Sequence, residues 1–149
     1  EGVRIVPIGR LADLPDTVRT QVEKAAELTA TNRELKLNLA ISYGSRLEIV
    51  NAVNQLLERA ANGEKLIIDE AAIAKHLYTA GDPEPDLIIR TGGERRLSNF
   101  LLWQAAYAEL YFSDIMWPDF TPQDFIEAIA EYQRRDRRFG RISTGRGLD

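Results

Sequence analysis

The sequence contains no cysteine and a single histidine, His76, among its 149 residues. Without cysteine the protein can form no disulfide, no thiolate nucleophile and no cysteine-ligated zinc site. One histidine also excludes a metal site built from several histidines, so any metal must rely on carboxylates and phosphate oxygens, which suit Mg²⁺. No apolar run approaches the roughly 20 residues that span a bilayer, and no amino-terminal signal pattern is visible, so we expect a cytoplasmic protein without a transmembrane segment.

The hydrophobic content, 44% of 149 residues, is ample for one packed domain, and the length is too short for two ordinary ones. We therefore expect residues 1–149 to form a single domain with a mobile tail at residues 141–149. The net charge of −4 argues against a protein whose whole surface holds nucleic acid. Six arginines nevertheless crowd the segment from Arg134 to Arg146, and a patch for nucleic acid or anionic lipid is one interpretation of that cluster.

Short apolar runs alternate with helical patterns along the chain. The runs predict strands at Val3–Ile8, Leu35–Ser42, Asp86–Thr91 and, more briefly, Glu109–Ser113. The helical patterns cover Pro15–Thr31, Ser45 to about Gly63, Asp69–Tyr78 and a last segment that opens at Thr121 and Pro122 and runs to about Arg138. Helix-length connections between strands imply βαβ units. The sequence therefore predicts an α/β fold in which helices flank an open, mainly parallel sheet.

Two helix starts are expected from local sequence. Ser45 and Glu48 form the pattern of a capping box, in which each side chain binds a free amide of the first turn. Ser98 stands before the apolar segment that runs to Leu110, where a helix amino terminus is expected. That second helix would have Glu109 near its carboxyl end.

Glycine and arginine follow each of the first three predicted strands, as Gly9-Arg10, Gly44-Ser45-Arg46 and Arg90-Thr91-Gly92-Gly93. Ligands of open parallel sheets bind outside the carboxyl ends of the strands. Glycine lets backbone amides approach an anion, and arginine binds phosphate oxygens through two parallel hydrogen bonds. The sequence therefore predicts a phosphate-binding edge, and the third segment, which adds Arg96 and Ser98, predicts a diphosphate site.

Each candidate residue also has a simpler interpretation. Ser98 would cap a helix whether or not it touches a ligand, whereas Arg90 ends a buried strand, where an unpaired charge carries a large desolvation cost. Glu109 opposes the dipole of the predicted helix and needs a cation, which is either Mg²⁺ or an arginine in a surface ion pair. Aromatic side chains could line an apolar ligand channel but are more often core. These aromatic residues are Trp103, Tyr107, Tyr111, Phe112 and Trp117.

The longest motif of the sequence is DLIIRTGGERRLSNFLLWQAAYAELYFSDIMWPDF, and two shorter ones are LNLAISYGSRLEIVNAV and RRDRRFG. The longest closely resembles the signature of the cis-prenyltransferases, the family of undecaprenyl and other polyprenyl diphosphate synthases. The second resembles an internal motif of that family, and the third resembles its carboxyl-terminal motif. The resemblance covers essentially the whole chain. It implies a cis-prenyltransferase-like fold and the condensation of isopentenyl diphosphate with an allylic diphosphate such as farnesyl diphosphate. The implied product is a long-chain cis-polyprenyl diphosphate, the lipid carrier precursor for cell-wall glycan synthesis.

The resemblance also implies residue roles. Arg90, Arg96 and Ser98 would hold the isopentenyl diphosphate, and Glu109 would help to place Mg²⁺, the implied cofactor. Arg138-Phe139-Gly140 would reach the diphosphate of the neighbouring subunit in a homodimer, so the basic end is expected to contact phosphate rather than nucleic acid. Peripheral contact with the inner face of the membrane is expected for release of the product.

Two departures from the family pattern qualify the resemblance. The Asp-Gly-Asn-Gly-Arg loop, which supplies the aspartate for Mg²⁺ in the family and cradles the allylic diphosphate, does not occur in the sequence. We therefore expect these residues to be the carboxyl-terminal part of a synthase, with amino-terminal strands and helices missing. The second departure is Arg95, which stands where some relatives carry a histidine, so its part in metal handling is open.

Two alternatives to an active synthase stay open. One is a noncatalytic fragment or partner subunit that keeps the fold and the dimer surface. The other is an unrelated nucleotide-binding α/β module, against which the absence of a P-loop or a G-x-G-x-x-G motif argues.

Overall fold

The computed structural model describes residues 2–135, and these residues form helices and parallel strands in two compact units. Of the described residues, the first unit comprises 2–83 together with Asn99–Trp103, and the second comprises Glu84–Ser98 together with 104–135. The predicted α/β class is confirmed, and each unit contains one pair of parallel strands.

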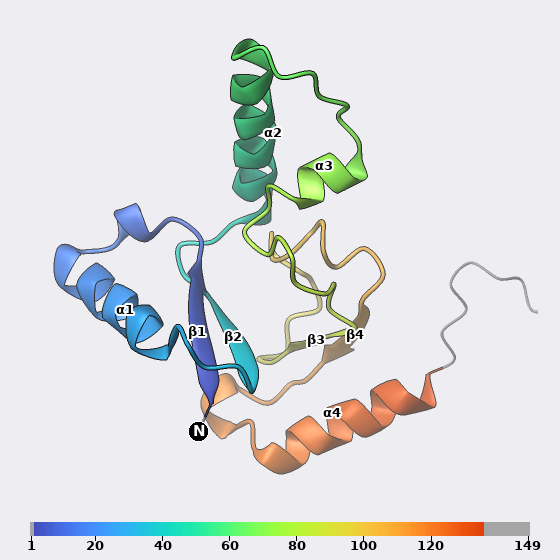
Figure 1. Cartoon of the computed structure of the whole chain (residues 1–149). Coiled ribbons are helices and arrows are strands. Elements are labelled where there is room, and N and C mark those ends of the chain that lie inside the picture. Colours follow the sequence, from blue (N-terminus) through green and yellow to red (C-terminus); the bar gives the residue numbers. More distant parts are fainter. Residues whose placement is uncertain (1, 136–149) are drawn as a thin grey trace, which may run out of the picture. The chain divides into compact units, whose positions relative to one another are not determined.

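In the first unit, strands β1 (Val3–Ile8) and β2 (Leu35–Ala40) pair in parallel along their whole length. Helix α1 (Asp16–Thr29) connects them and packs beside β1 (Figure 1). The connection is tightened near its end, where the backbone amide of Ile5 donates a hydrogen bond of 3.0 Å to the Thr29 hydroxyl. The predicted strand at β1 is confirmed in full, and β2 ends two residues before the predicted Ser42.

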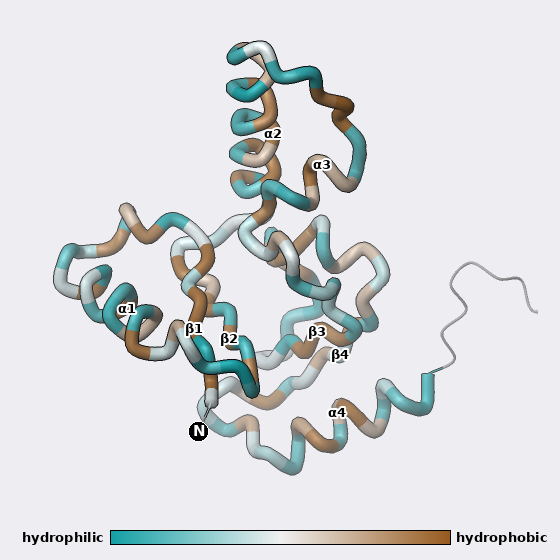
Figure 2. Tube along the Cα trace, viewed as in Figure 1, coloured by the Kyte–Doolittle hydropathy of each residue, from teal (hydrophilic) through white to brown (hydrophobic). Residues whose placement is uncertain are grey.

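Helices α2 (Ser45–Ala61) and α3 (Glu70–Ala74) complete the first unit. Helix α2 buries Ala52 and Leu56, and hydrophobic and hydrophilic residues alternate along it as expected for a helix with one buried face (Figure 2). It ends as predicted, at Asn62 and at Gly63 with a φ of +89°. Asp69 caps α3, but this helix is shorter than predicted because the residues after Lys75 form turns.

The capping box predicted at Ser45 and Glu48 is wrong. Gly44 is the residue that precedes α2, and no side chain of this local segment caps the helix. Instead, the Ser45 hydroxyl accepts a hydrogen bond from the amide of Leu102, and the Glu48 carboxylate accepts one from the amide of Tyr78. Both side chains are buried, and each accepts a hydrogen bond from the backbone of a residue far away in the sequence. They are therefore not available to cap the helix to which they belong.

In the second unit, strands β3 (Leu87–Arg90) and β4 (Glu109–Phe112) pair in parallel, with Arg90 opposite Phe112. Helix α4 (Pro122–Arg134) follows, and its sides differ in hydropathy (Figure 2). Thr121 and Asp124 form a complete capping box at its start, which confirms the helix start predicted at Thr121 and Pro122. Among residues 84–98 and 104–135, the buried apolar residues are Ile88, Ala105 and Ala128.

The helix predicted between Ser98 and Glu109 does not form, because residues 98–108 run in turns and bends. Three of its residues have left-handed backbone angles, with φ of 47° at Ser98, 65° at Asn99 and 46° at Leu101. Such angles are incompatible with a right-handed helix. Glu109 is consequently the first residue of β4, and no helix dipole acts on its carboxylate.

The prediction that the aromatic residues form core is wrong at two positions. Tyr107 is 74% exposed and Trp117 is 75% exposed. Trp117 stacks on the ring of Phe120, with centroids 6.4 Å apart, in a short 3₁₀ segment at Trp117–Asp119. No helix within residues 2–135 combines the length and the apolar character that crossing a bilayer requires.

Candidate functional site

The second unit brings two of the predicted diphosphate ligands together. Arg90 is the last residue of β3, and its guanidinium donates a hydrogen bond of 3.0 Å to the hydroxyl of Ser98. The same nitrogen donates to the main-chain carbonyl of Arg96. Both acceptors are neutral, and within residues 2–135 the Arg90 guanidinium forms no ion pair. A half-buried positive charge without a carboxylate is an arrangement that an anion can complete.

The paired glycines shape this loop but do not offer free amides to a ligand. Gly92 and Gly93 have φ of +88° and +76°, which let the chain reverse directly after β3. Their amides donate hydrogen bonds to the carbonyls of Ile115 and Ser113, at 2.8 and 2.9 Å. The expectation that these two amides cradle an anion is therefore wrong, and side chains must carry that role.

The guanidinium of Arg96 does not join that of Arg90. It forms an ion pair with Glu94, two residues earlier, and both side chains are exposed, at 62% and 48%. Exposed ion pairs of this kind contribute about 1 kcal/mol or less. A diphosphate, which carries more charge than one carboxylate, can therefore replace Glu94 at small cost.

Glu109, the predicted metal ligand, is bound by an arginine. Arg135 donates to the Glu109 carboxylate at 2.9 Å, to the Leu110 carbonyl at 2.8 Å and to the Glu131 carboxylate at 2.6 Å. The hydrogen bonds to Glu131 and then to Glu109 raise the pKa of Arg135 above its usual value. The simpler of the two interpretations of Glu109, an arginine ion pair, thus describes what the structure contains.

A metal site can be tested against these donors. In the described part of the chain, no three carboxylate or histidine side chains gather where they could hold a metal ion. Glu109 has the oxygen donors that Mg²⁺ prefers, and Mg²⁺ in phosphate-binding enzymes is often held by only one or two carboxylates together with substrate oxygens. The residues between 2 and 135 can therefore supply one ligand to Mg²⁺ but do not build a complete site.

At the first strand of the predicted phosphate edge, the arginine is already paired. Arg10 forms an ion pair of 2.6 Å with Asp13, and the Ser42 hydroxyl donates to the same carboxylate at 2.8 Å. Gly9 has a φ of +111°, and a Cβ atom on it would lie 2.1 Å from the Ile41 carbonyl oxygen. The glycine at this position is explained by close backbone packing rather than by a ligand.

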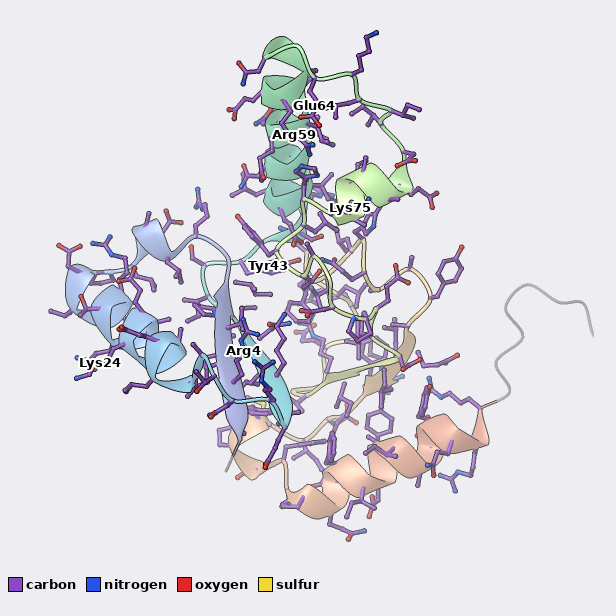
Figure 3. The ribbon with its side chains drawn as sticks, in the orientation of Figure 1. Arg4, Lys24, Tyr43, Arg59, Glu64 and Lys75 are labelled. Atoms are coloured by element: carbon purple, nitrogen blue, oxygen red, sulfur yellow. The ribbon has the colours of Figure 1, made fainter. Side chains whose placement is uncertain are left out.

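A buried polar cluster at the amino-terminal end of α2 was not predicted. The hydroxyl of Tyr43, which Figure 3 labels at this end, donates to the Glu48 carboxylate, whose other oxygen accepts from the amide of Tyr78. Burial and then the hydrogen bond to Glu48 raise the pKa of Tyr43 well above its ordinary value. No local pattern points to this cluster, because Glu48 and Tyr78 lie 30 positions apart.

Asn99, the residue after Ser98, is another residue that sequence alone did not single out. Its backbone carbonyl and its side-chain oxygen accept hydrogen bonds from the amides of Ser45 and Arg46. The predicted residues Arg138 and Gly140 lie outside the described residues.

Comparison with known proteins gives a consistent family assignment. The family profile described as "Putative undecaprenyl diphosphate synthase" matches residues 1–140. Over 145 residues the chain is 53% identical to an isoprenyl transferase of Geobacillus kaustophilus, covering 96% of this chain and 56% of the relative. A tritrans,polycis-undecaprenyl-diphosphate synthase (geranylgeranyl-diphosphate specific) of Methanocaldococcus jannaschii is 49% identical, with 93% and 51% covered. The chain thus spans about half the length of these relatives.

Solved structures show the same fold. Lavandulyl diphosphate synthase from Lavandula x intermedia, in complex with dimethylallyl diphosphate, superimposes with a TM-score of 0.89 at 37% identity, covering 93% of this chain and 60% of that protein. A probable undecaprenyl diphosphate synthase from Campylobacter jejuni gives a TM-score of 0.81 at 40% identity, with 94% and 64% covered. The predicted fold class is confirmed by both.

Proposed function

Because this chain belongs to the undecaprenyl diphosphate synthase family of cis-prenyltransferases, we propose that it carries the isopentenyl diphosphate half of a synthase active site. The complete enzyme would condense isopentenyl diphosphate with an allylic diphosphate such as farnesyl diphosphate. Repeated condensation would give a long-chain cis-polyprenyl diphosphate, a lipid carrier precursor for cell-wall glycan. Farnesyl diphosphate and the long product are proposed from the family resemblance.

One observation carries the proposal. The Arg90 guanidinium, at the carboxyl end of a parallel strand, is bonded only to neutral acceptors within the described residues, and one of them is Ser98. A diphosphate oxygen can take a charge-assisted hydrogen bond from the free N–H groups of this guanidinium. The Ser98 hydroxyl accepts from Arg90 and still has a proton to donate to a second oxygen.

The chemistry requires little proton transfer from these residues. The allylic carbon–oxygen bond breaks, and the leaving diphosphate takes the electron pair. The double bond of isopentenyl diphosphate forms the new carbon–carbon bond to that allylic carbon, which leaves a cationic carbon in the attacking substrate. A proton then leaves the carbon next to that cationic centre for the released diphosphate, and the C–H electron pair forms the new double bond. Arg90, Arg96 and Ser98 would hold the diphosphate of the attacking substrate, so their contribution is orientation and charge neutralisation.

The proposal keeps Mg²⁺ as the cofactor of the complete enzyme, with Glu109 as a ligand from this chain. When bound, Mg²⁺ would neutralise charge on the leaving diphosphate. Glu109 would have to exchange Arg135 for the metal, while Glu131 can keep the arginine paired. A homodimer in which Arg138 and Gly140 contact the neighbouring subunit's diphosphate is likewise part of the proposal.

A noncatalytic fragment or partner subunit remains the second candidate, because the chain spans about half the length of its relatives. Turnover measured after the remaining length of a synthase is supplied to this chain separates the two candidates, because only the synthase half then supports condensation. Condensation by a preparation whose intact mass is 16.8 kDa would show that the remaining length is dispensable. We expect no turnover until the remaining length of a synthase is supplied.

The test of the site is Arg90→Ala in the full-length enzyme. Loss of a charge-assisted hydrogen bond of about 1.5–3 kcal/mol raises the KM for isopentenyl diphosphate roughly tenfold to a hundredfold. Arg96→Ala is expected to raise it in the same direction. Arg33→Ala is the matched control, because Arg33 is exposed and forms no ion pair within residues 2–135. An unchanged KM in both Arg90→Ala and Arg96→Ala would refute the proposed site.

A further inference from the structure

Helix α2 begins without a capping side chain of its own, because Gly44 precedes it in an extended conformation with a φ of −155°. The first amides of a helix lack intrahelical acceptors and need external ones. Asn99 supplies two of them. Its carbonyl accepts from the amide of Ser45 at 2.9 Å, and its Oδ1 accepts from the amide of Arg46 at 2.8 Å. A residue 53 positions later in the chain thus performs the role of the missing cap.

The segment around Asn99 also donates a hydrogen bond back to the start of α2. The amide of Leu102 donates a hydrogen bond of 3.0 Å to the hydroxyl of Ser45, which is fully buried. The rings of Tyr43 and Phe100 meet edge to face, with centroids 5.8 Å apart. Residues 43–46 and 99–102 therefore form a clamp, which Figure 3 locates by the label of Tyr43.

Gly44 fits this clamp for steric reasons. A Cβ atom at Gly44 would lie 2.8 Å from Nδ2 of Asn99, closer than such atoms approach in proteins. The side chain of Asn99 therefore lies directly against the backbone that precedes the helix. This contact and the two accepted hydrogen bonds fix the orientation of Asn99.

The clamp holds a strained segment. Ser98, Asn99 and Leu101 all have positive φ, which costs non-glycine residues about 1–3 kcal/mol each and persists where surrounding contacts determine the conformation. Asparagine tolerates this conformation better than most residues do. Without the contacts of Asn99, the backbone at residues 98 and 99 is free to relax to negative φ.

We propose that Asn99 is a positioning residue for isopentenyl diphosphate, an inference that rests on the proposed function. Ser98 is the next residue in the chain, and its hydroxyl accepts the hydrogen bond from Arg90. Relaxation of φ at residues 98 and 99 would rotate this hydroxyl away from the guanidinium. Asn99 itself touches no reacting atom, so its effect acts through the Arg90–Ser98 pair.

Three variants of the full-length enzyme isolate the side-chain oxygen. Asn99→Gly keeps access to positive φ but removes Oδ1, Asn99→Asp keeps an oxygen acceptor, and Arg90→Ala removes the proposed ligand itself. The loss of this hydrogen-bond acceptor predicts that Asn99→Gly raises the KM for isopentenyl diphosphate about threefold to tenfold. The KM for the allylic substrate should stay within about twofold, and Asn99→Asp should restore isopentenyl diphosphate binding to within about twofold of the wild type.

Amide hydrogen exchange supplies a readout that does not depend on turnover. In Asn99→Gly the amide of Arg46 should exchange faster than in the wild type, and in Asn99→Asp it should not. If Asn99→Gly fails to fold, Ser45→Ala, which removes the acceptor for Leu102, tests the same clamp by the same two measurements.

The outcomes separate this inference from the proposed function. If Arg90→Ala raises the KM for isopentenyl diphosphate and Asn99→Gly does not, the positioning role is wrong while the site stands. An equal rise in both substrates' KM values, or no rescue by Asn99→Asp, also overturns it. If neither Arg90→Ala nor Asn99→Gly changes any KM, the proposed function fails together with the inference.

Discussion

The carboxylate of Glu48, only 1% exposed, accepts a hydrogen bond of 2.7 Å from the backbone amide of Tyr78. Its other oxygen accepts from the hydroxyl of Tyr43. One side chain thus links helix α2 to the residue Tyr43 just before it and to the turns that follow α3. Removing the carboxylate would leave two donors of the first unit without this acceptor, and unsatisfied buried donors are costly.

Glu48→Ala is expected to lower the free energy of unfolding by about 2–6 kcal/mol, since each of the two donors that lose their acceptor costs about 1–3 kcal/mol. Glu48→Gln should lose less, because the amide oxygen can still accept from Tyr78. Urea denaturation measures both. Glu58→Ala, an exposed glutamate on the same helix, is the control and should stay within about 0.5 kcal/mol of the wild type. Similar losses at both positions would show that Glu48 has no special role.

Gly9 and Gly63 form a matched pair for separating backbone strain from crowding. Both have positive φ, but a Cβ atom at Gly9 would collide with the Ile41 carbonyl, and at Gly63 nothing lies within 4 Å. Gly63→Ala should therefore cost only the conformational strain, about 1–2 kcal/mol. Gly9→Ala should cost at least about 2 kcal/mol more, because backbone must move. Equal thermal stabilities of the two variants would contradict the close packing at Gly9.

Asp82 is expected to make the free energy of unfolding depend on pH in the acid range. Burial alone would raise the pKa of this carboxyl, but hydrogen bonds from Lys36 and Asn38 outweigh it and hold the pKa below its usual value. Because the pKa is lower in the folded state, ionised Asp82 stabilises that state at pH values above about 3.9, the pKa of aspartate in an unfolded chain. This contribution should decline as the pH falls from there through the lower folded pKa.

The measurement is urea denaturation across this acid range for the wild type and Asp82→Asn. The difference between their unfolding free energies should be constant at neutral pH and shrink below about pH 4. Lys36→Met should weaken the pH dependence, because it removes the attractive charge beside Asp82. A difference that stays constant down to the lowest pH would show that Asp82 keeps its ordinary pKa when folded.

Glu109 and Glu131 allow the proposed metal ligand to be tested against a close neighbour. Both carboxylates accept hydrogen bonds from Arg135, but only Glu109 is proposed to bind Mg²⁺. In the full-length enzyme, Glu109→Gln should raise the Mg²⁺ concentration for half-maximal activity several times over, because the neutral amide is a weaker ligand. Glu131→Gln removes no proposed metal ligand, so it should raise that concentration less than Glu109→Gln does. The metal role of Glu109 is wrong if the two variants respond alike.

The elements that sequence predicted well are those set by local patterns. The strand at Val3–Ile8, the end of α2 at Asn62 and Gly63, and the capping box start of α4 all follow from apolar runs, glycine and proline. The helix predicted after Ser98 failed for a different reason. The Asn99 carbonyl and the Leu102 amide bond to Ser45, and the Asn99 side chain accepts from the amide of Arg46. No local pattern reports such long-range partners.

In the candidate site, too, some relationships were predicted from the sequence and others were not. Arg90 and Ser98 were predicted as neighbours, and the structure brings them into contact. The ion pair of Arg96 with Glu94 was not predicted. An arginine partner was one of the two interpretations of Glu109, but Arg135 was not identified as that partner, because many arginines and acidic residues compete. Asn99 was missed because its importance depends on a helix that lies far away along the chain.

The cap that Asn99 provides also bears on how the chain acquires its structure during synthesis. The first turn of α2 cannot complete its hydrogen bonds until residue 99 has emerged from the ribosome, 53 residues after Arg46. Closing a loop of that length carries an entropic cost that short-range capping avoids, so this end of the helix should become ordered late. A nascent chain halted before residue 99 would therefore expose a frayed helix start to chaperones and proteases.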